Sequence, residues 1–136
     1  MQNDEFRTMN KAAVMPHDST NLRNRTKTYA LRMVKLYQIL PKSGEAQIIG
    51  KQILRSGTSV GAQYREACRA KSSADFISKM EGSLQELDET GYWLELLAES
   101  GIMPADQLTD LQKENSELTA IFVASVITAK KNRNAR

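Results

Sequence analysis

Apolar residues recur at every third or fourth position through most of the chain beyond residue 20, and this spacing predicts α-helices. Prolines, glycines and polar clusters divide the pattern into segments that each match one amphipathic helix. The predicted helices cover about residues 22–40, 44–71, 73–100 and 104–131. No segment alternates apolar and polar residues for long enough to predict a strand, so the expected fold class is all-α.

Residues that start or stop helices lie at the boundaries between these segments. Ser43, and then Ser72 or Ser73, suit the N-cap positions of the second and third helices. Gly101 is placed to end the third helix in a left-handed conformation, and Pro104 suits the first turn of the fourth. Because the links between helices are short, we expect an antiparallel up-down-up-down four-helix bundle.

The length of 136 residues predicts one folded domain. Residues 21–131 should form the bundle, preceded by a flexible N-terminal arm at residues 1–20 and followed by a basic tail at residues 132–136. The arm is predicted because its apolar residues have no helical or strand period.

The sequence gives no indication of secretion or membrane insertion. The single cysteine, Cys68, cannot form an intramolecular disulfide, and we expect it to pack in the core as a small side chain. The N-terminus lacks the continuous apolar run of a signal peptide. The longest apolar-rich run, residues 120–129, is well short of the roughly 20 residues that span a bilayer. A cytoplasmic location without a membrane partner is therefore expected.

Two glycines four residues apart, Gly57 and Gly61, lie inside the second predicted helix. Each costs about 1 kcal/mol relative to alanine in a helix interior. The compensation we expect is the close approach of another helix at a notch. Tyr64 and Trp93 are also assigned structural roles. Trp93, with Tyr92 beside it, should fill or flank the notch while its indole N–H reaches a polar partner; stacking on a nucleic-acid base is the alternative.

The first and fourth helices carry more apolar surface than one core-facing stripe requires. The first is apolar over well over half its circumference, and eight of the ten residues 120–129 are apolar. Soluble monomers mostly avoid exposing such patches. Burial between subunits of an oligomer is one explanation, and coverage by the N-terminal arm is the other.

Positive and negative charges are segregated along the chain, although the net charge is only +3. Residues 21–44 contain six bases and no acid, residues 51–71 five bases and one acid, and the third helix seven acids and one lysine. Basic helices could pair with acidic ones, within or between subunits, or they could form a patch that attracts nucleic-acid phosphates. The candidate phosphate contacts are Arg23, Arg25, Lys27, Arg32, Lys35, Arg55, Arg65, Arg69, Lys130 and Lys131.

No motif predicts catalysis, and we assign no catalytic, cofactor-binding or metal-ligating residue. Two-metal sites in helical bundles need Glu-x-x-His pairs on two helices, whereas the only histidine here, His17, lies in the arm. The run from Gly57 to Gly61 resembles a phosphate-binding loop only superficially, because it lacks the Gly-Lys-Ser/Thr ending.

One ion pair between helices is expected to fix their register rather than to perform acid–base chemistry. It would join Glu86 or Glu89 of the third helix to Arg55, Arg65 or Arg69.

Two segments carry a family resemblance: LPKSGEAQIIGKQILRSGTSVGAQYREACRAKSSADFISKM at residues 40–80 and ELDETGYWLELLAESG at residues 86–101. With these segments the chain resembles, over about residues 24–130, the four-helix-bundle proteins encoded within intervening sequences of bacterial large-subunit ribosomal RNA genes. Two positions depart from the family pattern: Gln63 stands where asparagine is usual, and Gln85 where lysine is frequent. The second change removes a positive charge from the third helix.

The resemblance implies an antiparallel bundle that assembles as a homopentamer with a central opening. A distant relative, the accessory protein of diversity-generating retroelements, is a basic pentamer that binds nucleic acid and a reverse transcriptase. We therefore expect a non-enzymatic, oligomeric bundle that binds RNA or DNA through backbone phosphates with low sequence specificity. The alternative is a protein–protein adaptor, for example for a reverse transcriptase or another nucleic-acid enzyme, that does not bind nucleic acid itself.

Overall fold

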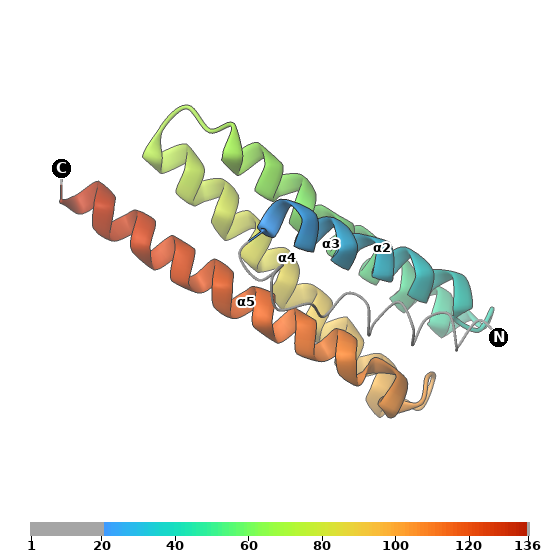
Figure 1. Ribbon diagram of the computed structural model, residues 1–136. Helices are drawn as coiled ribbons and strands as arrows, with labels where there is room; N and C mark the ends of the chain where they lie inside the picture. The colour runs from blue at the N-terminus through green and yellow to red at the C-terminus, as the bar shows by residue number, and fades with distance from the viewer. Residues whose placement is uncertain (1–20, 136) are drawn as a thin grey trace.

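The computed structural model describes residues 21–135, and regular structure in this part of the chain is entirely helical (Figure 1). The expected N-terminal arm lies outside the described residues. The helices are α2 (Leu22–Ile39), α3 (Gly44–Cys68), α4 (Ser73–Glu99) and α5 (Ala105–Asn134). The described part of the chain is therefore all-α, as predicted.

Several helix ends follow the capping signals in the sequence, although Ser43 makes no side-chain cap hydrogen bond and Pro104 is the N-cap residue of α5 rather than part of its first turn. The Asn21 side chain accepts a hydrogen bond from the Asn24 amide at 3.1 Å, and the Ser72 hydroxyl accepts one from the Asp75 amide at 3.0 Å. Gly101 follows α4 with φ of 77°, the left-handed conformation expected there. Two helix ends differ from the prediction by three residues. α3 ends at Cys68 rather than at residue 71, and α5 continues to Asn134, into the segment predicted to be a basic tail.

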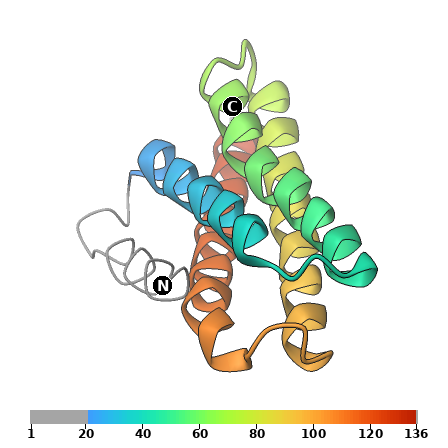
Figure 2. The same cartoon turned by 90° about the vertical axis from the view of Figure 1, so that its right-hand side faces the viewer.

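Consecutive helices lie side by side, and Figures 1 and 2 show the chain turning back at each short connection. The backbones approach closely in the pairs α2–α3, α3–α4 and α4–α5. In contrast, α2 and α5 meet through long polar side chains, such as Arg25 with Glu114. With 18 residues against 30, α2 is also much shorter than α5.

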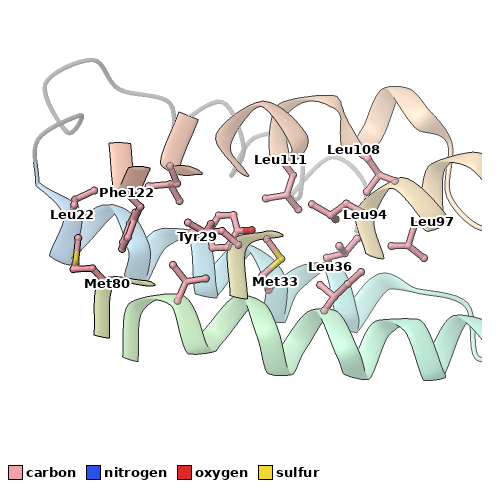
Figure 3. Close-up of a cluster of buried hydrophobic side chains, with 14 of the residues drawn as sticks. Leu22, Tyr29, Met33, Leu36, Met80, Leu94, Leu97, Leu108, Leu111 and Phe122 are labelled. Carbon is pink, nitrogen blue, oxygen red and sulfur yellow. The ribbon is translucent and has the colours of Figure 1, made fainter. Parts of the chain in front are cut away.

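The core lies between the helices and receives side chains from all four of them (Figure 3). Tyr29, Met33 and Leu36 of α2 are fully buried, and Phe122 of α5 is buried near the start of α2. These side chains recur at the three- and four-residue steps that predicted the helices. Burial of one such apolar side chain contributes roughly 1.5–3 kcal/mol.

The notch predicted at Gly57 and Gly61 is present and is filled by α2. Both glycines are buried. A Cβ atom on Gly61 would lie 3.1 Å from the Thr26 hydroxyl oxygen, and one on Gly57 would overlap the Met33 side chain. The two glycines therefore allow α2 and α3 to pack closely, which confirms the role predicted for them.

Two expectations about individual side chains need correction. Trp93 does not fill the notch, because Met33 and Thr26 occupy it; Trp93 lies half-buried on α4, packed against the core. Cys68 is exposed rather than buried, because it is the last residue of α3 and lies beyond the buried Ala67.

Candidate nucleic-acid interface

Four of the candidate phosphate contacts gather on the surface formed by α2 and α3. Arg23 and Lys27 are exposed one turn apart on α2, and Arg65 and Arg69 are exposed one turn apart at the end of α3. The two helices meet here, because a Cβ atom on Gly61 of α3 would lie only 3.1 Å from the hydroxyl oxygen of Thr26 on α2. We call Arg23, Lys27, Arg65 and Arg69 the basic face.

A shallow groove runs between α2 and α3 within the basic face. Lys27 and Arg65 line it from opposite helices, together with Thr26, Thr58 and Gly61. No acidic residue is among its lining residues. The Thr26 and Thr58 hydroxyls already donate to the Leu22 and Leu54 carbonyls, each at 2.6 Å. The groove therefore offers phosphate oxygens two cations on neighbouring helices, Lys27 and Arg65.

Two other candidate contacts are paired with acids of α4. Arg55 forms ion pairs with Glu86, at 3.4 Å, and with Glu89, as expected for a pair that holds α3 against α4. The Trp93 indole N–H also donates to Glu89, at 3.0 Å, so its predicted polar partner is confirmed. This hydrogen bond, together with Arg55, lowers the pKa of Glu89. Lys130 pairs with Glu81 at 3.0 Å.

Arg25 and Arg32 are corrections to the predicted set, because both are buried. The Arg25 guanidinium donates to both Glu114 oxygens, at 2.8 and 2.6 Å, and to Glu117 at 2.9 Å. The hydrogen bond to Glu114 raises the pKa of Arg25. Arg32 has no exposed surface, and burial lowers its pKa while Glu114 partly compensates. Neither side chain can contact a phosphate in this conformation.

Lys35 and Lys131, the two remaining candidates, lie outside the basic face. Lys35 is half-buried on α2, two turns beyond Lys27, and Lys131 is exposed near the end of α5.

The sequence-based set missed a buried polar network that joins α2 to α4 and α5. The Asn115 amide donates to the Tyr29 hydroxyl at 2.6 Å and to the Leu87 carbonyl at 3.0 Å. Burial raises the pKa of Tyr29 well above its usual value. The network could have been predicted from the positions of Glu114 and Asn115, because both lie between Leu111 and Leu118 on the apolar side of α5.

Tyr64 has the structural role expected of it. Its ring contacts Phe122 edge to face, with centroids 5.9 Å apart, and so links α3 to α5. Burial and the neighbouring Cys68 thiol raise the pKa of Tyr64 to about 12. The hydroxyl therefore stays protonated at neutral pH.

Residues 21–135, the part of the chain that the structure describes, contain no membrane-spanning helix and no cluster of metal-ligating side chains. None of the four helices is both long and apolar enough to span a membrane. No group of three or more His, Cys, Asp or Glu side chains in this part of the chain is arranged to hold a metal ion.

Comparisons with known proteins identify a family. The family model of the 23S rRNA-intervening sequence proteins matches residues 19–124 of this chain. A crystal structure at 1.70 Å of a protein of unknown function from the S23 ribosomal protein family of Bacteroides thetaiotaomicron VPI-5482 is similar, with 37% identity and a TM-score of 0.73. The match covers 77% of this chain and 97% of that one. No curated protein matches the chain.

Proposed function

Because the chain belongs to the 23S rRNA-intervening sequence protein family, we propose that it is a non-enzymatic bundle that binds RNA or DNA through backbone phosphates. The observation that carries the proposal is the groove between α2 and α3, which Lys27 and Arg65 line without an acid beside them. Phosphate contacts of this kind carry little sequence information, so we expect low sequence specificity. A cytoplasmic location, where nucleic acid is available, is part of the proposal.

The basic face suits a phosphate backbone because its cations come in pairs on two helices. Within each pair the residues are four positions apart, so their Cα atoms are separated by about 6 Å along the helix axis. This separation is close to that between successive phosphates of an extended strand. The close contact between α2 and α3 at Gly61 keeps the two pairs near each other.

We further propose that the helices form an antiparallel up-down-up-down bundle and that copies of it assemble as a ring-like homopentamer. Support for self-association comes from apolar side chains left exposed on α5: Val123 is 39% exposed and Ile127 is 50% exposed. Leu31 on α2 is likewise 50% exposed. The number five comes from the family resemblance alone.

Phosphate binding is tested by charge reversal in the groove. Labelled RNA and DNA strands of mixed sequence are titrated with the full chain and with the Lys27→Glu/Arg65→Glu variant at about 50 mM and about 200 mM salt. We expect affinity for both strands to fall steeply with salt in the unchanged protein. The variant should bind much more weakly, with a salt slope reduced by about two, because each lost phosphate contact removes about one counterion.

The matched control is Lys42→Glu/Lys113→Glu, which changes the net charge equally at two exposed positions outside the groove. It should retain most of the affinity. Equal losses in the two variants would mean that overall charge, rather than the groove, attracts nucleic acid. A flat salt response in the unchanged protein would rule out phosphate binding.

The second candidate function is that of an adaptor that binds a protein, for example a reverse transcriptase or another nucleic-acid enzyme, without binding nucleic acid. It is favoured by the internal pairing of Arg25, Arg55 and Lys130, which uses these charges to hold helices together. The adaptor predicts no nucleic-acid binding even at the lower salt concentration. The same titration therefore decides between the two functions.

A further inference from the structure

A second groove lies between α4 and α5 and differs in charge from the basic face. Its α4 wall contains Asp88, Tyr92 and Glu95, and its α5 wall includes Ser116 and Thr119. The three α4 residues are spaced by four and three positions, so they share one side of the helix. No lysine or arginine is among the lining residues.

Tyr92 is unusually exposed for an aromatic residue on this bundle. Its side chain is 54% exposed and contacts the Trp93 ring edge to face at 5.1 Å. Carboxylates therefore lie one turn before and one turn after an accessible aromatic ring. A positive group is attracted both by the carboxylates and by the face of such a ring.

The floor of this groove offers a hydrogen-bond acceptor, the side-chain oxygen of Asn115. Asn115 is 8% exposed and uses its amide group to donate to Tyr29 and Leu87. Its carbonyl oxygen accepts no hydrogen bond from the residues that the structure describes. This oxygen is not one of the fully buried atoms without a partner among the described residues, and Asn115 lines the groove, so the oxygen is open to a donor that enters from outside.

Gly91 opens the path from the groove to that acceptor. A Cβ atom on Gly91 would lie 2.8 Å from the Asn115 carbonyl oxygen and would cover it. The Thr119 hydroxyl already donates its hydrogen to the Asn115 backbone oxygen at 2.8 Å, so it faces other groups only as an acceptor. A suitable ligand must therefore supply several donors and a positive charge.

We propose that this groove binds an arginine side chain in a basic segment of a partner protein. A guanidinium group has five donors in a planar array and stacks on aromatic rings, which a lysine ammonium group does not match. The exposed acids of α4 continue past the groove to Glu99, so a segment with several positive charges can lie along the helix. This inference does not depend on phosphate binding at α2 and α3.

The test uses a fluorescent hexa-arginine peptide and the full chain, with binding followed by anisotropy. We expect Asp88→Asn/Glu95→Gln to weaken binding by about tenfold or more, because two charged hydrogen-bond acceptors are lost. Gly91→Ala should also weaken binding, although it leaves the charge unchanged. Hexalysine should bind more weakly than hexa-arginine to the unchanged protein, and Tyr92→Leu should reduce this difference.

The matched control is Glu45→Gln/Glu66→Gln, which removes the same charge from two exposed positions on α3. Equal weakening in this control and in Asp88→Asn/Glu95→Gln would overturn the proposal, as would the absence of hexa-arginine binding.

Light scattering of the protein without peptide tests whether the occupant of the groove is instead a second copy of this chain. If Asp88→Asn/Glu95→Gln changes the oligomeric state, the groove binds a second copy of this chain, and the assignment to a partner protein is wrong. Gly91→Ala and Tyr92→Leu leave the net charge unchanged and should not alter nucleic-acid affinity.

Discussion

Gly57 and Gly61 are buried because Met33 and Thr26 occupy the space that side chains at these positions would fill. The sequence predicted this contact because two glycines in a helix interior carry a cost that close packing offsets. It did not predict which residues fill the notch, because many apolar or small side chains fit beside a glycine. Trp93 was expected to fill or flank the notch, whereas Met33 and Thr26 fill it.

Replacement of Gly61 by leucine should destabilise the protein by about 1–3 kcal/mol, because the new side chain must displace Thr26 or separate α2 from α3. Urea denaturation followed by circular dichroism measures the loss. Gly44→Leu is the control, since a Cβ atom at Gly44 has no neighbour within 4 Å. Equal stability of the two variants would contradict the packing role of Gly61.

At the level of the helix, α2 combines an apolar and a polar mode of attachment. Its apolar side chains pack in the core, whereas Arg25 joins it to Glu114 of α5. The boundaries of α2 were predictable because caps and periodicity are local signals. The burial of Arg25 and Arg32 was less obvious, although both continue the three- and four-residue steps that link Leu22, Tyr29 and Leu36. A charged residue at such a position is ordinarily taken as exposed, because burying an unpaired charge is costly.

Arg25→Met should destabilise the protein by about 3–5 kcal/mol, because Glu114, only 3% exposed, loses its charged partner. Adding Glu114→Leu should recover only part of this loss, because it removes the uncompensated carboxylate but also the acid that partly offsets the burial of Arg32. Urea denaturation at neutral pH compares the single and double variants. Arg55→Met is the control on a more exposed pair and should cost about 1 kcal/mol or less. A similar cost for both arginines would refute the account of Arg25.

For the molecule as a whole, charge is divided between two surfaces. The basic face lies on α2 and α3, and the acidic groove lies between α4 and α5. The segregation was visible in the sequence, because whole helices differ in sign. The sequence did not reveal which charges are used internally, since that depends on which helix faces which. In the folded chain Arg25 and Arg32 are buried, and Arg55 and Lys130 pair with acids of α4. These four side chains are therefore not freely available to a phosphate.

Self-association is expected to depend on the exposed apolar side chains of α5. Ile127→Glu should shift the protein toward the monomer, because a charge would have to be buried at a contact between copies. Light scattering at a fixed protein concentration measures the shift. Thr109→Glu introduces the same charge at an exposed polar position of the same helix and should leave the mass unchanged. An unchanged mass in Ile127→Glu would place the contact on another surface.

Gly61 belongs both to the seam between α2 and α3 and to the lining of the basic groove. A mutation there would alter the strength of helix packing and the shape of the ligand surface together. Evolution therefore has little freedom to tune one property without disturbing the other. A related protein would therefore acquire a new ligand more readily by replacing the charged residues that line the groove than by changing the glycine between the two helices.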